Sequence, residues 1–467
     1  MRHIFFDVSD LRGHLAGGHR ISGIQRVTLM VLDEAARLID GDTTVHLSYL
    51  RRGTYQSVAY TPAASRGSLL DQVSRSLGLA TAAPVHVPSL EKYTPGTAKY
   101  AFHRGKRQIN AIIGNEAHFT RRGITLSEWK GAMAPSGPAP KVTVTPVSDL
   151  AGPGDTVFVL GAFWADPALP GHLLRLRQAG VEVATLVHDL IPILFPQYVA
   201  GHHGQTFHAA LHGSLAYTSR YIANSDCTAR DLQQFLEVHD ADTPVDTVPL
   251  AQTGLDDGST TAPKPATPYA LLQETARVRG EIKALLKQPY ALYVGTWDIR
   301  KNLWRLARAW DRLMADRDIE VPKLVLAGAP GWGNDDFARM MEATGNLGGL
   351  IELIHAPSDA ELDFLYRHCD FTVFPSLYEG WGLPVGEGLS YGKTALAAEI
   401  SSIPEVGGDL VAYCDPTSVR SIADTARRLI ADPGARRTLE SRISQARLRQ
   451  WSDVARDVLF SKQTVAT

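Results

Sequence analysis

Short apolar stretches alternate with longer stretches of helical periodicity along this chain, and the alternation runs through twice. In the first half, strand-like runs fall at residues 3–8, 45–50, 156–160, 183–187 and 221–223. In the second half, they fall at residues 290–294, 323–327, 351–353, 371–374, 394–398 and 411–413. Strands that alternate with helices are typical of a parallel sheet covered on both faces. The sequence therefore predicts an α/β fold with two doubly wound, Rossmann-like domains.

The length of 467 residues also favours two domains, because one hydrophobic core rarely serves so long a chain. A stretch rich in Pro, Thr and Asp at residues 250–268 is a candidate linker. We therefore expect domains at residues 1–268 and 269–448, followed by a C-terminal amphipathic segment at residues 449–467. Residues 51–146 have weak periodicity and many Pro, Gly, Ser and basic residues, which predicts an irregular insertion in the first domain.

Charge and cysteine content exclude some classes of protein. A formal net charge of −2 argues against nucleic-acid binding by the whole molecule. The three cysteines are scattered without metal-like spacing, which favours reduced thiols in a cytoplasmic compartment. An acid already at Asp7 argues against a signal peptide. No apolar run approaches the roughly 18 residues of a membrane span, so any membrane contact would be peripheral.

Two carboxylates flank a glycine-rich turn at residues 374–388, directly after a strand-like run. Glu379 and Glu387 enclose three glycines and Pro384, after which a helix can start. A helix start beside glycines suits a phosphate, whereas carboxylates suit the hydroxyls of a ribose or a hexose. The combination indicates a sugar nucleotide. The alternative is a solvated loop acid and a second acid that favours the helix dipole.

A basic pair follows another strand-like run. Arg300 and Lys301 stand at a strand-to-helix turn, where a guanidinium and an ammonium can meet a diphosphate. Asn302 would cap the following helix. An exposed basic turn is the alternative, but the carboxyl end of a strand is where ligands bind in doubly wound sheets.

Two sites in the first half could join the same cleft. His188 and Asp189 follow a strand-like run, and the imidazole could hydrogen-bond a sugar hydroxyl or serve only a structural role. Asp189 could orient the loop or accept from the imidazole. Gly23 opens the first helix and permits close approach of a ligand, although an ordinary N-cap by Ser22 explains the same residues.

Other chemistries lack their signatures. There is no Gly-x-Gly-x-x-Gly after the first strand, no Walker loop and no Gly-x-Ser-x-Gly elbow. His202, His203, His208 and His212 form a His-rich stretch, in which His208 and His212 are four residues apart on a predicted helix, but no third ligand or acid completes a metal site with that pair. We therefore expect no metal and no cofactor.

With these motifs in view, the second half resembles retaining glycosyltransferases of family 4, which have the GT-B fold. The resemblance runs from residue 293 to about residue 416 and is carried by the motifs at residues 294–302, 326–328, 365–366, 374–387 and 403–408. The first half matches less densely, at residues 22–27, 188–189, 224–225 and 248–250. In such folds the C-terminal helix returns to the first domain, and residues 451–459 fit that role.

The resemblance implies a role for each matching residue. Glu387 would bind the donor ribose. Glu379 and His188 would contact the transferred sugar. The implied catalytic residues are His188, Arg300, Lys301 and Glu379. The implied donor-binding residues are Gly23, Thr296, Ser376, Gly380, Trp381, Gly382, Leu383 and Glu387. Relatives carry an arginine at the position of Thr296, so Arg300 or Lys301 would take over its duty.

The implied reaction moves a hexose from a nucleoside diphosphate sugar to a hydroxyl of a saccharide or lipid-linked saccharide, with retention. Mannose is favoured, with glucose and rhamnose as alternatives, and bacterial surface polysaccharide is the expected product. The donor phosphate itself would take the acceptor proton. The expected partners are donor and acceptor, without nucleic acid, at the cytoplasmic face of the inner membrane. A sugar-nucleotide epimerase and a catalytically silent scaffold of the same fold remain the alternatives.

Overall fold

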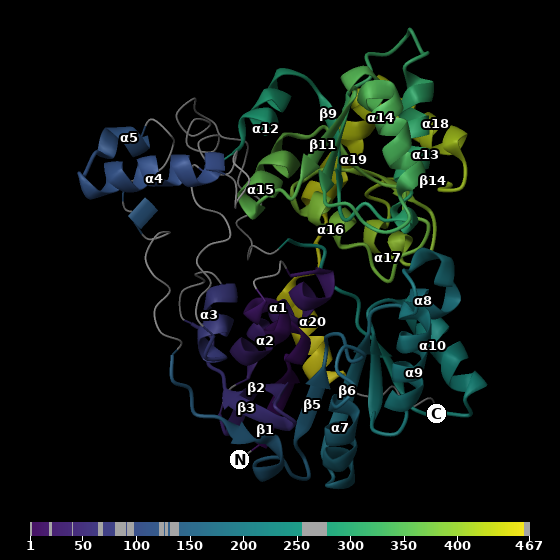
Figure 1. Cartoon of the computed structure of the whole chain (residues 1–467). Coiled ribbons are helices and arrows are strands. Elements are labelled where there is room, and N and C mark those ends of the chain that lie inside the picture. The colour runs from purple at the N-terminus through teal and green to yellow at the C-terminus, as the bar shows by residue number, and fades with distance from the viewer. Residues whose placement is uncertain are drawn as a thin grey trace.

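The computed structural model describes residues 2–17, 21–39, 41–63, 69–79, 90, 98–120, 126, 129–130, 140–254 and 278–461. Two sheets with helices on both faces lie one above the other, with the first half of the chain below in Figure 1 and the second half above. The fold is thus α/β with two Rossmann-like parts, as the alternating sequence pattern predicted. Most of the candidate linker lies outside the described residues.

The first sheet has eight strands in the order β4-β3-β2-β1-β5-β6-β7-β8. Their bounds are Arg2–Asp7 (β1), Thr43–Arg51 (β2), Thr54–Ala59 (β3), Thr145–Pro146 (β4), Thr156–Val159 (β5), Glu182–Val187 (β6), Arg220–Ala223 (β7) and Val245–Thr247 (β8). Six strands are parallel, while β3 and β4 extend one edge antiparallel. The prediction that residues 51–146 are irregular is wrong in part, because β3, β4, α3, α4 and α5 lie among the described residues of this segment.

The second sheet has six parallel strands in the order β11-β10-β9-β12-β13-β14. Their bounds are Tyr290–Val294 (β9), Lys323–Gly328 (β10), Ile351–His355 (β11), Phe371–Phe374 (β12), Ala395–Ala398 (β13) and Ala412–Cys414 (β14). The strand order reverses between β9 and β12, so the loops that follow these two strands diverge and leave a crevice between them. The basic pair and the glycine-rich turn are those two loops.

Helices cover both sheets. Those of the first half are Ser9–Ala16 (α1), Gly23–Leu38 (α2), Leu69–Ser76 (α3), Ala98–Ile112 (α4), Glu116–Thr120 (α5), Leu169–Gln178 (α7), Ile191–Leu194 (α8), His203–Ser214 (α9) and Asp226–Val238 (α10). Those of the second half are Gly280–Ala284 (α12), Leu303–Leu313 (α13), Asp335–Gly349 (α14), Asp359–His368 (α15), Leu383–Ser390 (α16), Ile403–Gly407 (α17), Val419–Ala431 (α18), Pro433–Gln445 (α19) and Trp451–Phe460 (α20).

The last helix belongs spatially to the first sheet. Helix α20 packs against α2 among the helices of the lower half in Figure 1. Arg220 at the start of β7 donates to the carbonyl of Val458 at 3.1 Å, and Trp451 Nε1 donates to the carbonyl of Gly254 at 3.2 Å. The chain therefore crosses between the two halves twice. Among the described residues, no helix has both the length and the apolarity needed to cross a bilayer.

Candidate functional site

A cavity of about 590 Å³ lies between the two halves, which is the size range of small-molecule sites. Its walls come from α2, from the loops after β6 and β9, and from the turn after β12. Eleven of the twelve predicted site residues line it: Gly23, His188, Thr296, Arg300, Lys301, Glu379, Gly380, Trp381, Gly382, Leu383 and Glu387. The twelfth, Ser376, is fully buried outside the cavity lining, and its hydroxyl has no hydrogen-bond partner.

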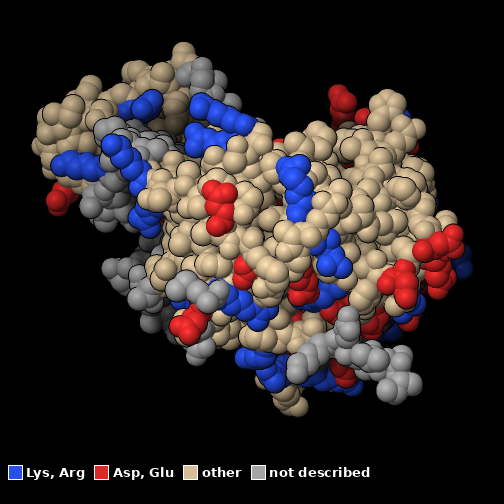
Figure 2. All heavy atoms as spheres, turned by 90° about the horizontal axis from the view of Figure 1, so that it is seen from below, with Lys and Arg blue, Asp and Glu red and all other residues tan. Residues whose placement is uncertain are grey.

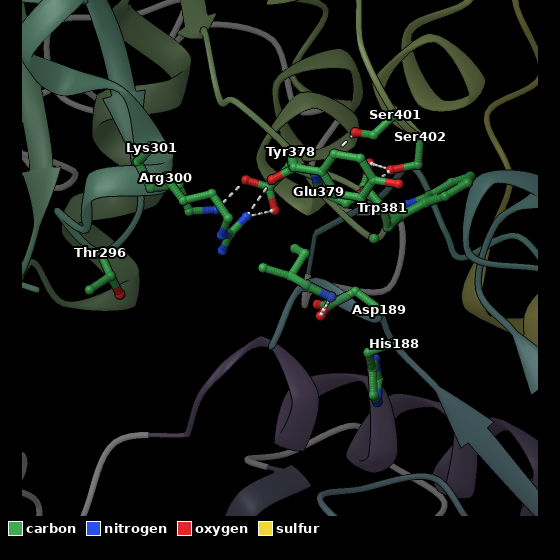
Figure 3. Close-up of polar contacts among 12 residues, drawn as sticks. His188, Asp189, Thr296, Arg300, Lys301, Tyr378, Glu379, Trp381, Ser401 and Ser402 are labelled. Atoms are coloured by element: carbon green, nitrogen blue, oxygen red, sulfur yellow. Dashed lines mark hydrogen bonds and ion pairs between the residues drawn. The ribbon is translucent and has the colours of Figure 1, made fainter. Parts of the chain in front are cut away.

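Three charged side chains form a cluster on one wall (Figure 3). Arg300 Nη1 lies 2.5 Å from Glu379 Oε2, and Lys301 Nζ lies 2.5 Å from Glu379 Oε1. Arg300 also donates to the carbonyl of Tyr378 at 2.7 Å. The two cations come from the turn after β9 and the carboxylate from the turn after β12. The sequence predicted these residues in one site but did not predict that both oxygens of Glu379 hold the cations.

The electrostatics of this cluster favour the charged forms of Glu379 and Arg300. Burial alone would raise the pKa of Glu379, but Arg300 and Lys301 outweigh it and lower that pKa to about 2. Burial opposes the charge of Arg300, yet Glu379 and Asp298 raise its pKa above the ordinary value. The pKa of Lys301 is lowered, first by burial and then by Arg300 beside it. Glu379 is therefore an ionised carboxylate whose charge is already compensated.

Glu387 is held from both halves of the molecule. Its Oε1 accepts from Arg26 Nη1 on α2, and its Oε2 accepts from the hydroxyl of Tyr366 on α15 at 2.7 Å. The ring of Tyr366 stacks on that of Tyr391, with 5.0 Å between centroids and 7° between planes. The sequence singled out Glu387 but neither of its partners, because nothing in the local pattern around Arg26 points to a residue 361 positions away.

The glycine-rich turn has no room for a side chain at one point. A Cβ at Gly380 would lie 1.8 Å from the carbonyl oxygen of His188, so the backbones of the two halves approach each other closely there. Gly382 has φ +109° and precedes α16, a conformation that favours glycine. The hydroxyl of Ser402 donates to the carbonyls of Glu379 and Trp381 at 2.9 and 3.0 Å, which holds the turn in shape.

His188 is a neutral hydrogen-bonding group at the floor of the cavity in Figure 3. Burial lowers its pKa, so the imidazole is uncharged at neutral pH. Its Nε2 lies 2.8 Å from the carbonyl oxygen of Leu160, which can only accept, so Nε2 carries the proton and Nδ1 can accept. Asp189 accepts from the backbone amide of Ile191 at 3.0 Å and so orients the loop.

The predicted cap on the helix after the basic pair is wrong. Asn302 stands at the N-cap position of α13 but makes no capping hydrogen bond. Its φ is +64°, and its amide donates to the carbonyls of Pro375 and Pro416 at 2.9 and 2.7 Å. Asn302 therefore fastens the basic turn to the turn after β12, a role that depends on tertiary contacts.

A metal has no evident site. In the parts of the chain that the structure describes, no group of three or more His, Cys, Asp or Glu side chains could hold a metal ion. The two helical histidines instead make ring contacts with His239, at centroid distances of 5.7 Å from His208 and 4.8 Å from His212.

Known proteins resemble parts of this chain in sequence. Residues 275–448 match the family described as glycosyl transferases group 1. The chain is 29% identical over 281 residues to O-antigen chain mannosyltransferase B of Escherichia coli, which covers 60% of this chain and 68% of that protein. It is 24% identical over 278 residues to the serotype-specific mannosyltransferase WbdA of Escherichia coli, which covers 59% of this chain and 32% of WbdA.

Solved structures share the architecture of the whole chain. The crystal structure of HepE from Anabaena in complex with UDP aligns over 98% of both chains, with a TM-score of 0.55 and 14% sequence identity. At that identity the likeness extends to the fold, including the arrangement of two Rossmann-like parts around a cleft. The second sheet and its cavity wall are thus similar in sequence to a known family, and the whole chain is similar in fold to a UDP-bound protein.

Proposed function

We propose that this chain is a glycosyltransferase with the GT-B fold and that it transfers mannose from a nucleoside diphosphate sugar to a saccharide hydroxyl, with retention at the sugar. The observation that carries the proposal is the buried cluster of Arg300 and Lys301 around Glu379 in a cavity of donor size. The mannosyltransferases among the similar proteins support the choice of mannose. Glucose and rhamnose are the competing donors.

The donor would lie along the cavity with its ends on different groups. Glu387 would take the ribose hydroxyls, because a carboxylate accepts from two neighbouring hydroxyls. Arg300 and Lys301 would take the diphosphate, with backbone amides between Gly380 and Leu383 completing its hydrogen bonds. The sugar would then face His188, whose Nδ1 can accept from a hydroxyl.

Catalysis follows from where charge develops. As the bond between the sugar C1 and the phosphate oxygen breaks, negative charge grows on the leaving diphosphate and positive charge on the sugar. Arg300 and Lys301 would stabilise the departing diphosphate without a metal or cofactor. The acceptor oxygen would bond to C1 on the same face, and its proton would pass to a phosphate oxygen of the leaving group.

The state of Glu379 supports this route over a double displacement. A nucleophilic carboxylate needs a free oxygen, whereas both oxygens of Glu379 are engaged by cations. Its pKa of about 2 also makes it a weak base. Glu379 would therefore position Arg300 and Lys301 and present the pair to the diphosphate, with the sugar close by.

The acceptor we propose is a saccharide, free or lipid-linked, in the synthesis of a bacterial surface polysaccharide at the cytoplasmic face of the inner membrane. Nucleic acid is not among the proposed partners. The O-antigen chain mannosyltransferase among the similar proteins supports a polysaccharide product.

A thermal-shift screen of nucleoside diphosphate sugars tests the donor, because a ligand that binds only the folded state raises the melting temperature. GDP-mannose should give the largest rise, and a product assay with a mannose-containing acceptor should then yield one new α-linkage. A change in the donor sugar without acceptor would point to an epimerase. The absence of any shift across the panel would point to a silent scaffold.

A further inference from the structure

Helix α4 exposes a row of large apolar side chains. Phe102, Ile109 and Ile112, together with Ile113 directly after the helix, are between 62 and 76% exposed. Phe102 and Ile109 are seven residues apart, so they fall on one face of the helix, with Ile112 beside them and Ile113 next to Ile112 in the chain. Four such side chains in one row are a larger apolar surface than singly scattered residues would give.

The opposite face of α4 is packed, so the exposed row does not reflect a helix without a fixed orientation. Ala111 is buried in a small cluster with Phe119 and Trp129, and Tyr100 packs against that cluster. This packing fixes the orientation of the helix, so the row of Phe102 and the isoleucines faces outward. Figure 1 shows α4 and α5 standing to one side of both sheets, so a contact on this row would leave the central cavity uncovered.

The charges of α4 have one sign. The helix contains Lys99, Arg104, Lys106 and Arg107 and no Asp or Glu. Arg104 and Lys106 are both exposed. Lys106 lies beside the row, about 40° around the helix from Phe102, whereas Arg104 lies about 80° beyond Ile112, toward the packed face. In Figure 2 the lobe that projects at the upper left carries mainly Lys and Arg side chains among uncharged ones. The chain as a whole has a net charge of −2, so this positive charge is local.

We propose that α4 lies in the surface of an anionic lipid bilayer, with Phe102 and the three isoleucines among the acyl chains and the exposed basic residues at the headgroups. Helices that lie in a membrane interface combine an apolar row with Lys and Arg beside it. Fifteen residues give a helix about 22 Å long, enough for such a contact and too short to span. The choice of this surface rests on the proposed use of a membrane-borne acceptor.

The charge pattern favours an anionic bilayer over a protein groove or a nucleic acid as the partner of this apolar row. An amphipathic helix that fits a protein groove is held mainly by its apolar residues, and it does not require a uniformly basic border. A nucleic acid would use the cations but gains little from a row of isoleucines. An anionic bilayer uses both, because its headgroups attract Lys and Arg while its acyl chains take the apolar row.

The test is sedimentation of the full chain with vesicles of phosphatidylcholine alone or with about one third phosphatidylglycerol. The protein should bind the anionic vesicles and bind them less as salt increases. An Ile109→Ser, Ile112→Ser double variant should lose at least about tenfold in vesicle binding. The same applies to an Arg104→Glu, Lys106→Glu variant. Val238→Ser, which changes an exposed apolar residue on α10 that is 79% exposed, should bind as the unmodified chain does.

Two outcomes would overturn the proposal. One is equal binding by the unmodified chain and the isoleucine variant. The other is concentration-dependent self-association of the unmodified chain that the isoleucine variant abolishes, which would make the row a protein contact. Equal melting temperatures check that the variants fold. Donor binding in the thermal-shift screen is independent of vesicle binding, so a failure of α4 and a failure of the proposed function are separate results.

Discussion

Replacing Gly380 by Ala tests whether backbone contact between the two halves sets the geometry of the site. The Cβ of alanine would lie 1.8 Å from the carbonyl oxygen of His188, whereas ordinary contact begins at 3.4 Å. One of the two backbones must therefore retreat by at least about 1.6 Å, because neither neighbour is a flexible side chain. Gly380 follows Glu379 directly, so the retreat separates the carboxylate and its cations from the wall that carries His188.

The magnitude follows from the size of that displacement. A misplacement of about 1 Å can cost about a hundredfold in rate, because reacting groups lose their alignment. We therefore expect kcat/KM of the Gly380→Ala variant to fall by at least about a hundredfold, which corresponds to about 3 kcal/mol of transition-state stabilisation. The melting temperature should change far less, because each half also has a buried cluster built only from its own residues.

The assay is the initial rate of sugar transfer over a range of donor concentrations, with a thermal melt of the same preparation. Gly213→Ala is the matched control, because a Cβ there meets nothing within 4 Å and alanine favours the helix in which Gly213 lies. That variant should keep the unmodified rate. A Gly380→Ala variant with near-normal kcat/KM would refute the reasoning, since the two halves would then not need this contact during turnover.

The other variants probe charges in the cavity. Lys301→Ala should lower kcat by at least about a hundredfold, measured as product formed at saturating donor, because the leaving diphosphate loses one cation; near-normal rates would remove Lys301 from the mechanism. Glu387→Gln should raise the donor KM by about tenfold or more, because the ribose would lose a charged acceptor. Tyr366→Phe should raise the donor KM only a fewfold, because the carboxylate of Glu387 remains. The folded-state pKa of Glu379 is lowered to about 2 by its ion pairs with Arg300 and Lys301. These ion pairs therefore stabilise the fold fully above about pH 4.5, and the stabilisation is lost as the pH falls toward 2. Denaturant unfolding should register roughly 3 kcal/mol from this group, and a Glu379→Gln variant should lack that part of the acid sensitivity.

The fold could be predicted wherever burial alone determines the pattern. Strands β9 and β12 have the predicted bounds, because strands in the middle of a parallel sheet are buried on both faces and read as apolar runs. Strand β3, Thr54–Ala59, was missed because its mixture of polar and apolar residues makes sense only beside β2, with which it pairs antiparallel. Helix α4 was missed as well, because one of its apolar faces is exposed and basic residues interrupt the other.

The site divides in a similar way. The turns that carry Arg300, Lys301 and the two glutamates could be predicted, because glycines and charges at strand ends mark them locally. The pairings could not, since Glu379 meets cations 78 positions away and Glu387 meets Arg26 from the other half. Such pairs depend on how the strand ends converge and how the halves approach each other, and neither is encoded in local spacing.

The two glutamates therefore differ in what holds them. Every cation on Glu379 comes from the same half of the molecule, so that cluster persists whether or not the halves meet, and the cations stand ready for a diphosphate before a donor arrives. Glu387 is shared, because Tyr366 comes from its own half and Arg26 from α2 of the other. A ribose bound to Glu387 as proposed would share this carboxylate with Arg26, because a carboxylate accepts about four hydrogen bonds and two are already made. Donor binding would then be coupled to the contact between the halves at Glu387, whereas the cations at Glu379 would not depend on that contact.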